Sequence, residues 1–392
     1  MLCRLFVIFL FFFPTLLSSQ EREIPNYTIT KNPIESKPLY EIGIENEEIL
    51  NSEYSIFEGK NISEVIDFFK NIPTNNKNYT VERLVYKILI SKLDFGESVV
   101  SDKEDRLLLE IRVKKLFELG KFTDIDNFFS QIPPNYENSY VNLKRIEAYL
   151  LRNEFKNACS LVNEQNEETS FQLGKFDIIC SIINQNFEKA RFNLELLKEL
   201  NVPGDILFIE LAYKIMGDIE VSQKEIEAKN LSKFSSLTPI LLSYLQIAEI
   251  SPTFENLKDA PISSLIFILS SPTTNSEIKT YCAERLVKLK RISPNILAEV
   301  YQLNNFKNEE IQNVIQVYKT LSPVKSRSLL YQAIVKEVDP NVKFELIKYL
   351  LVNGKKNKLF PSLAHILKDS LNYEDLEDLS PDDIILILDL FF

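Results

Sequence analysis

Two stretches of the chain carry nearly the same eleven residues, and this internal repeat limits the fold more than any other feature. The first reads SEVIDFFKNIP from Ser63 to Pro73, and the second reads TDIDNFFSQIP from Thr123 to Pro133. Ser or Thr followed by an acidic residue is typical of a helix start, whereas proline prevents a helix from continuing. Ser63 and Thr123 are therefore the expected N-caps of short helices, and the paired phenylalanines are expected in the core. A longer segment with helical apolar periodicity follows each proline, which predicts a unit of two helices.

A second spacing runs through the middle of the chain. Four apolar residues each follow a Gly or Asn by one or two positions, at intervals of 33, 32 and 32 residues, and these are Phe122, Phe155, Phe187 and Ile219. Gly and Asn suit the left-handed conformation that ends a helix, so each pair predicts a helix end and a helix start. The preceding residues are Gly120, Asn153, Asn186 and Gly217. A two-helix unit with this period resembles the tetratricopeptide-type repeat over residues 100–230, and the resemblance implies a stacked superhelix.

Beyond residue 250 the expected helix starts are marked by Ser-Pro or Asp-Pro pairs. Pro is favourable at the first helical position, because its missing N–H would have no partner there. We therefore predict an all-α, right-handed solenoid of α-α hairpins. Tetratricopeptide-like repeats are expected over residues 41–250, and further hairpins that end in a capping helix over residues 251–392. The pairs are Ser251-Pro252, Ser293-Pro294, Ser322-Pro323, Asp339-Pro340 and Ser380-Pro381.

The first residues have the composition of an export signal. Arg4 precedes an apolar run over residues 5–13, which is typical of a signal peptide and short for a membrane span. We predict a signal peptide over residues 1–19, with an uncleaved anchor as the alternative, and an extended polar linker over residues 20–40. No later segment is apolar for about 18 residues, so no stable membrane span is expected in the mature chain. The expected location is the periplasm, or else the extracellular side of a secretory pathway.

Export to an oxidising compartment would make the cysteines informative. Cys159 and Cys180 lie in two expected helices, and residues 21 apart can face each other if those helices pack antiparallel. The sequence leaves two alternatives open for them, a disulfide or two buried free thiols. Cys282 has no evident partner and is expected in the core. None of the three has CxxC spacing or a nearby His, so redox and zinc chemistry are not expected.

Residues that carry catalysis are scarce. His365 is the single histidine and lies among apolar residues of an expected helix, where a packed or half-exposed side chain is expected. The sequence contains no G-x-S-x-G elbow, Walker loop or G-x-G-x-x-G motif. We therefore expect no catalytic, cofactor-binding or metal-binding residues, no cofactor, and a protein that is not an enzyme.

The charge distribution argues against a nucleic-acid partner. The net charge is −11, and an acidic protein repels phosphate backbones. Two short basic clusters, at residues 288–291 and 355–358, lack interleaved aromatic residues. Basic residues in the last turn of a helix interact favourably with the helix dipole, so both clusters are expected to be solvated helix ends.

The C-terminal segment DDIILILDLFF combines acids suited to a helix start with many apolar residues. This helix either docks on the final repeat or offers an apolar contact to a partner. The candidate interaction residues are Ile384, Ile385, Leu388, Phe391 and Phe392.

Repeats without catalytic groups favour a protein that acts by binding, because stacked repeats present an extended concave surface. The expected function is an interaction scaffold that holds a peptide or protein partner in this groove. A factor in cell-wall metabolism and a lipid or small-ligand carrier are the alternatives. Residues 155–200 are similar to secreted helical-repeat proteins of α-proteobacterial type, and that resemblance implies no particular activity. The sequence predicts neither the identity of the partner nor the oligomeric state.

Overall fold

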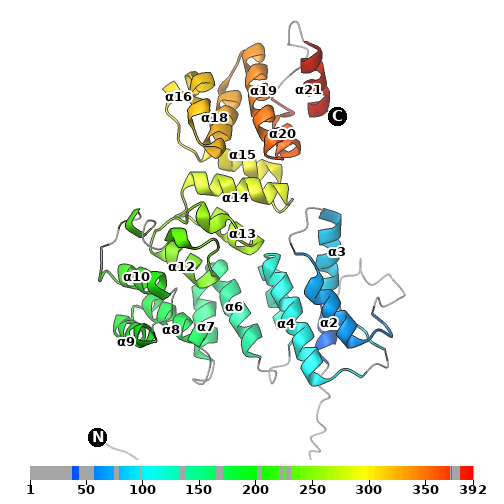
Figure 1. The fold of residues 1–392 in the computed structure, drawn as a ribbon, viewed down its shortest axis with the longest axis vertical. Helices are drawn as coiled ribbons and strands as arrows, with labels where there is room; N and C mark the ends of the chain where they lie inside the picture. The colour runs from blue at the N-terminus through cyan, green and yellow to red at the C-terminus, as the bar shows by residue number, and fades with distance from the viewer. Residues whose placement is uncertain are drawn as a thin grey trace, which may run out of the picture. The chain divides into compact units, whose positions relative to one another are not determined.

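The structure, a computed structural model, consists of helices, turns and loops, and the part of the chain that it describes contains no strand (Figure 1). The predicted all-α class is therefore confirmed for this part. The predicted signal peptide and most of the predicted linker lie outside the described residues. The described residues are 38–43, 57–74, 79–96, 99–132, 138–164, 171–200, 205–220, 222, 224–226, 231–370, 372 and 380–391.

The described α-helices follow one another along the chain. They are α2 (Ile62–Asn71), α3 (Tyr79–Ile90), α4 (Asp102–Glu118), α5 (Phe122–Phe129), α6 (Ser139–Leu151), α7 (Phe155–Asn163), α8 (Phe171–Ile183), α9 (Phe187–Glu199), α10 (Asp205–Ile215), α12 (Pro239–Ile247), α13 (Ile262–Ser270), α14 (Ser276–Lys288), α15 (Pro294–Gln302), α16 (Asn308–Gln312), α17 (Val314–Val317), α18 (Pro323–Lys336), α19 (Pro340–Lys356), α20 (Phe360–Leu367) and α21 (Pro381–Phe391). Four short 3-10 helices accompany them, η1 (Leu39–Glu41), η2 (Leu231–Lys233), η3 (Glu255–Leu257) and η4 (Tyr318–Thr320). Many consecutive helices pack as pairs, among them α6 with α7, α8 with α9, α13 with α14, and α18 with α19.

Other contacts join helices that are distant in the sequence. α12 packs against α6, and α13 packs against both α4 and α6. Arg291, in the turn after α14, forms a buried ion pair with Glu82 of α3 and donates a hydrogen bond to the carbonyl of Thr74 at 3.4 Å. Each repeat of a solenoid contacts mainly its neighbours, so these long-range contacts are not expected from the repeat pattern.

Buried apolar side chains form two clusters that both include α14. The first extends from Leu39 to Leu286, and the second extends from Ala283 to Leu367. Leu286 of α14 belongs to the first cluster, whereas Ala283 and Val287 of the same helix belong to the second. Because α14 buries residues in both clusters, changes on this helix affect packing on two sides.

The helix ends confirm most of the predicted Gly and Asn signals. The confirmed left-handed residues are Gly120, Asn153 and Gly217. α5, α7 and α9 begin at the predicted phenylalanines, but the predicted start at Ile219 is wrong, because Ile219 lies outside any helix. The expectation for Asn186 is wrong, because Gln185 is the left-handed residue, with a φ of 59°. Asn186 instead caps α9, since its side chain accepts a hydrogen bond from the amide of Lys189 at 3.3 Å.

The predicted caps of the repeated stretches are wrong. α2 begins after Asn61, whose side chain accepts a hydrogen bond from the amide of Ser63 at 2.9 Å. Asn is as good an N-cap as Ser, so the earlier residue starts the helix. α5 begins after Lys121, which forms no side-chain cap. The paired phenylalanines also differ, because Phe69 is fully buried whereas Phe68 is 45% exposed.

Four of the five proline signals are confirmed, since α15, α18, α19 and α21 begin at the predicted prolines. The exception is Ser251-Pro252. The hydroxyl of Ser251 is buried and accepts hydrogen bonds from the amide and the side chain of Asn275, at 3.2 and 3.1 Å. Ser251 therefore fixes the start of α14 and does not cap a helix of its own.

Candidate functional site

Helix α14 contributes to the walls of three pockets. Asn275 fixes its N-terminus by accepting a hydrogen bond from the amide of Ile278 at 2.9 Å. Three charged residues of the C-terminal half, Glu284, Arg285 and Lys288, line the pockets, whereas apolar residues of the helix fill the core. This helix therefore brings charged groups next to each pocket.

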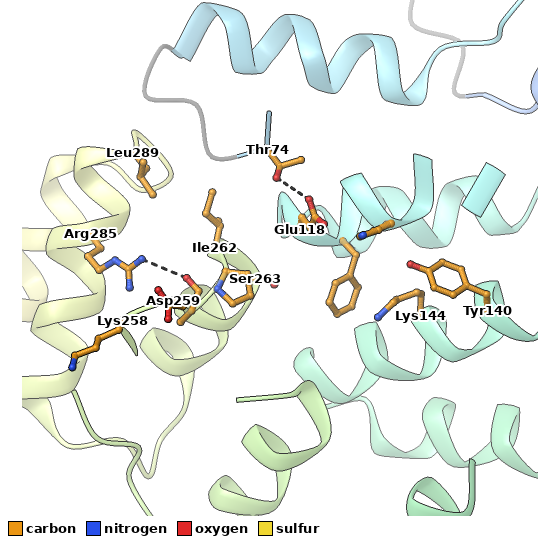
Figure 2. A pocket seen from close by; sticks show the side chains of 14 residues that line it. Thr74, Glu118, Tyr140, Lys144, Lys258, Asp259, Ile262, Ser263, Arg285 and Leu289 are labelled. Atoms are coloured by element: carbon orange, nitrogen blue, oxygen red, sulfur yellow. Dashed lines mark hydrogen bonds between the residues drawn. The ribbon is translucent and has the colours of Figure 1, made fainter. Parts of the chain in front are cut away.

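The first pocket, here called the α4–α13 pocket, has a volume of about 670 Å³ (Figure 2). Residues of α4, α6, α13 and α14 line it, with the loop before α13. Several of its charged groups already have partners. Lys144 pairs with Glu147 at 2.5 Å, and Glu118 accepts a hydrogen bond from Thr74 at 2.8 Å. Arg285 donates to one carbonyl at the end of η3 and to one in the loop before α13.

Two hydroxyl groups of the α4–α13 pocket are not activated for chemistry. Burial raises the pKa of Tyr140 to about 12, and the charges of Glu147, Glu110 and Glu118 add to this effect. The Ser263 hydroxyl is buried without a hydrogen-bond partner in the described structure, and no histidine lines the pocket to deprotonate it. In this pocket the hydroxyl that contacts a carboxylate is that of Thr74, which donates to Glu118 at 2.8 Å, whereas Tyr140 and Ser263 have no base as a partner among the described residues.

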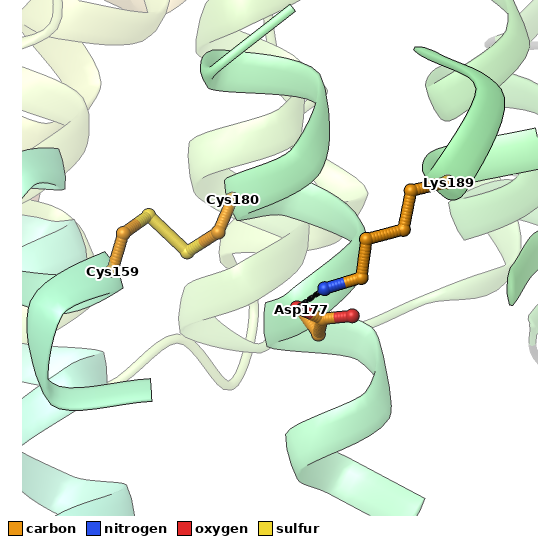
Figure 3. Close-up of a disulfide and its surroundings, with 4 residues drawn as sticks. All are labelled: Cys159, Asp177, Cys180 and Lys189. Atoms are coloured by element: carbon orange, nitrogen blue, oxygen red, sulfur yellow. Dashed lines mark hydrogen bonds and ion pairs between the residues drawn. A yellow bond between two sulfur atoms is a disulfide. The ribbon is translucent and has the colours of Figure 1, made fainter. Parts of the chain in front are cut away.

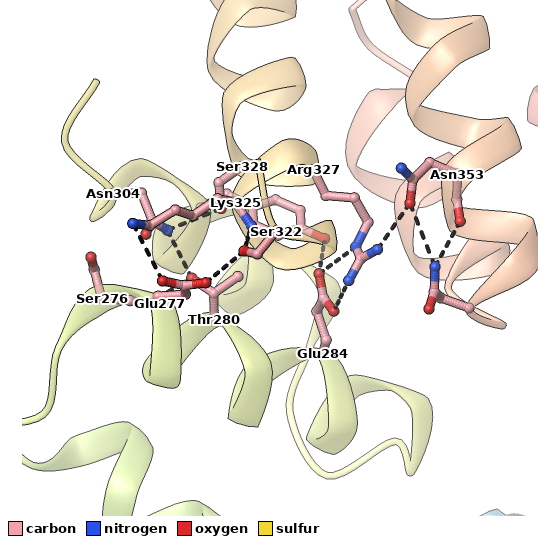
Figure 4. A network of polar contacts seen from close by, with 12 residues as sticks. Ser276, Glu277, Thr280, Glu284, Asn304, Ser322, Lys325, Arg327, Ser328 and Asn353 are labelled. Carbon is pink, nitrogen blue, oxygen red and sulfur yellow. Dashed lines mark hydrogen bonds and ion pairs between the residues drawn. The ribbon is translucent and has the colours of Figure 1, made fainter. Parts of the chain in front are cut away.

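The second pocket, the α14–α18 pocket, has a volume of about 440 Å³ and contains a buried polar network (Figure 4). Arg327 of α18 donates two hydrogen bonds to the carboxylate of Glu284, at 2.6 and 2.5 Å. The Nη1 group of Arg327 donates a hydrogen bond to the side-chain oxygen of Asn353 in α19 at 2.9 Å. The hydroxyl of Tyr301 in α15 donates to the carboxylate of Glu284 at 3.0 Å. The network joins four helices and pairs the charges of Glu284 and Arg327 with each other, whereas Lys288, which also lines this pocket, has no ion-pair partner among the described residues.

The third pocket is here called the basic pocket. It has a volume of about 440 Å³ and lies between the end of α14, the start of α15 and the start of α20. The two basic clusters of the sequence fall at the ends of α14 and α19 as predicted. The expectation that both are solvated is wrong for Arg291, which forms the buried ion pair with Glu82. The fold also brings the two clusters together with the single histidine. The lining residues are Val287, Lys288, Lys290, Ile292, Pro294, Lys358, Pro361, Ser362 and His365.

The charges of the basic pocket are not balanced. None of its lining residues is acidic. In the described part of the chain, no ion pair or side-chain hydrogen bond joins Lys288, Lys290, Lys358 or His365 to another residue. The ion pairs of α18 and α19 that involve lysines are formed by Lys325 and Lys348. Three ammonium groups thus line one cavity without a carboxylate, which distinguishes this pocket from the other two.

The electrostatics of Lys288 are consistent with this excess of positive charge. Lys288 is exposed overall, but partial desolvation of its ammonium group by the pocket lowers its pKa, and Glu284 opposes this effect. The positive charges of Arg327, Arg285 and Lys358 lower the pKa further. A bound anion would offset this repulsion, because an opposite charge nearby favours the protonated ammonium.

Two of the pocket lysines have an unfavourable backbone conformation. Lys290 and Lys358 have φ angles of 56° and 57°, and the amide after each lysine donates to a carbonyl of the last helical turn. Glycine usually occupies this position, and a residue with a side chain costs about 1 kcal/mol there. Asn153, Gln185 and Glu249 share the conformation but do not line the pocket.

The predicted cysteine pair lies in α7 and α8 (Figure 3). Cys159 and Cys180 form a disulfide with an S–S distance of 2.06 Å and a Cα–Cα distance of 5.5 Å. Cys282 is a buried free thiol of α14, and burial raises its pKa to about 12. The disulfide fastens one helix pair and lies outside the three pockets described above.

The predicted C-terminal interaction element lies on α21, which contacts α20. Ile384, Ile385 and Leu388 are each about half exposed, at 48%, 58% and 49%. Asp383 attaches the helix to α19 through an ion pair with Lys348 at 2.8 Å. The side chains of Phe391 and Phe392 lie outside the described residues. The structure does not bring this element into the basic pocket.

Comparisons with known proteins identify no relative of this chain. No family model, curated protein or solved structure matches it. Over the described residues, no group of three or more potential metal ligands comes together, and none of the helices has both the length and the apolar character to cross a bilayer. The molecule is thus a largely helical protein with many packed helix pairs.

The basic pocket is the feature that sequence reasoning missed. The segments KLKRISP and KKNKLFP both contain two lysines separated by one residue, and a proline follows within four residues of the second lysine. The second lysine occupies the place after a helix where Gly or Asn is expected. That departure from the expected residue is the signal that could have identified Lys290 and Lys358.

Proposed function

We propose that the protein is a non-enzymatic scaffold that holds a peptide or protein partner. The observation that carries this proposal is the basic pocket, where three lysines and a histidine line one cavity without an acidic residue. Unpaired ammonium groups that share a cavity repel each other, so a partner with negative charge would relieve this cost. The two other pockets support the same view, because much of their charge is already paired within the protein.

The proposed scaffold is a stack of tetratricopeptide-like hairpins in the periplasm. The starts of α5, α7 and α9 at intervals of 33 and 32 residues support the repeat. The disulfide between Cys159 and Cys180 supports export, because such bonds persist in oxidising compartments. N-terminal sequencing of the mature protein tests the export signal, and a chain that begins near residue 20 is expected.

Site-specific photo-crosslinking in cells tests the scaffold function. A photoreactive amino acid at Pro361, in the wall of the basic pocket, is expected to yield one discrete adduct with a second protein or peptide. The matched control places the same group at Val352, which is 57% exposed on α19 and does not line a described pocket. No adduct at Pro361, or equal adducts at both positions, would contradict the proposed function.

A further inference from the structure

We propose that the basic pocket binds an acidic peptide segment, whose carboxylates contact Lys288, Lys290 and Lys358. This inference rests on the proposed scaffold function and names the chemistry of the partner. The three ammonium groups come from two segments of the chain, with Lys288 and Lys290 at the end of α14 and Lys358 in the turn before α20. Three positive charges from two segments suit several carboxylates along a peptide.

The backbone around the pocket favours carboxylates over a single phosphate group. Phosphate sites commonly use several free amides at a helix N-terminus or in a backbone nest. At the start of α20, the amides of Ser362 and Leu363 already bond to the carbonyl of Leu359 at 3.0 Å, and Pro361 has no N–H. α15 likewise begins with Pro294. The pocket therefore offers ammonium groups and few backbone donors.

Apart from Ser362 and His365, the remaining lining residues of the pocket are apolar. Val287, Ile292, Pro294 and Pro361 lie beside the charged groups, and the cavity of about 440 Å³ has room for a peptide side chain. Apolar contact adds affinity, because it removes hydrocarbon surface from water. A peptide that alternates acidic residues with a few leucines matches this combination of charge and apolar surface.

The left-handed backbone of two lysines supports a binding role. Strained residues persist where the surrounding structure holds them, and they often occur at functional sites. Lys290 and Lys358 would fit the turn better as glycine, with φ angles of 56° and 57°, yet each places an ammonium group at the same pocket. Replacement by glycine therefore separates the two effects, because it should improve folding and weaken binding.

Fluorescence anisotropy of the full-length protein tests the proposal. The probe is a labelled twelve-residue peptide of glutamates with two leucines, and its control has glutamine in place of every glutamate. We expect the glutamate peptide to bind and the glutamine peptide to bind at least about tenfold more weakly. Lys290→Gly and Lys358→Gly should each weaken binding about threefold, and the double variant about tenfold, as expected for partly exposed ion pairs.

A matched control keeps the test independent of folding. Gln185→Gly makes the same backbone change at an exposed left-handed residue that does not line a described pocket, with a φ of 59°. All three glycine variants should raise the Tm by about 1–2 °C. Only the two lysine variants should lose affinity, so a loss of affinity together with a higher Tm cannot be attributed to unfolding.

Three outcomes would overturn the proposal. The first is equal affinity for the two peptides, and the second is unchanged affinity in the double lysine variant. The third is displacement of the peptide by inorganic phosphate at micromolar concentration, which would show a compact phosphate site. If neither peptide binds but the crosslink at Pro361 persists, the acidic class is wrong and the scaffold function stands. Loss of the crosslink at Pro361 contradicts the scaffold function itself.

Discussion

Arg327 of α18 and Glu284 of α14 form a bidentate ion pair, with exposed side-chain fractions of only 2% and 4%. Removal of one partner leaves the other charge buried, which typically costs about 3–5 kcal/mol. Arg327→Met should therefore lower the free energy of unfolding by about 3 kcal/mol in chemical denaturation. The double variant Glu284→Leu/Arg327→Met should lose less free energy of unfolding than either single variant, because it leaves no unpaired buried charge.

The control for this pair is Lys258→Met, because the ion pair of Lys258 with Glu255 is more than half exposed. Exposed ion pairs contribute about 0–1 kcal/mol to stability, so the free energy of unfolding of this variant should stay close to that of the unmodified protein. A similar small loss for Arg327→Met would show that the buried network does not hold α14 and α18 together.

The disulfide between Cys159 and Cys180 should stabilise the packing of α7 on α8. A bond that closes a loop of this length contributes about 3 kcal/mol, mainly by restricting the unfolded chain. Reduction should therefore lower the Tm of the oxidised protein. The variant Cys159→Ala/Cys180→Ala provides the control, since its Tm should not respond to reductant. An equal response of both proteins would show that the effect of the reductant does not come from this disulfide.

Gly354 of α19 lies against α20, where an added Cβ would collide with the side chain of buried Leu363. Gly354→Ala should destabilise the protein by about 1–3 kcal/mol, as is typical of overpacking in a core. Gly174→Ala in α8 is the matched control, because nothing lies within 4 Å of its added Cβ. That helical substitution should stabilise by about 0.5–1 kcal/mol. Stabilisation by both substitutions would contradict the described packing of α20.

The pKa of Lys288 tests the described arrangement of the basic pocket. Burial and the positive charges of Arg327, Arg285 and Lys358 lower this pKa below its ordinary value. Lys358→Gly removes one of these charges, so the pKa of Lys288 should rise. A pH titration by NMR of ¹³C-methylated lysines measures it. Lys198 serves as the control, because its raised pKa arises from Glu195 and Tyr213 and should not change.

Helix positions were predictable where local backbone chemistry decides them. Gly120 and Asn153 adopt the left-handed conformation as expected, because few other residues do so at low cost. Helix starts marked by proline were predicted equally well for α15, α18, α19 and α21. The wrong expectation at Ser63 arose because Asn61, an equally suitable cap, lies two residues earlier. The one at Asn186 arose because Asn186 caps the next helix, while Gln185 takes the left-handed conformation.

The candidate site was less predictable, because it depends on contacts between distant segments. Local sequence correctly placed Lys288 and Lys356 in the last turns of helices, but it does not encode that the two helix ends line one pocket. The contact of α13 with α4 was not predicted for the same reason. Such contacts depend on the packing of several helices, so the repeat period of one segment does not predict them.

Titration of the ¹³C-methylated protein with the glutamate peptide tests the central claim most directly, since methylation preserves the lysine charge. The expected result is a saturable shift of the signals of Lys288, Lys290 and Lys358, with no shift of Lys198. Shifts confined to lysines elsewhere, or equal shifts with the glutamine peptide, would contradict a scaffold that holds an acidic segment in the basic pocket.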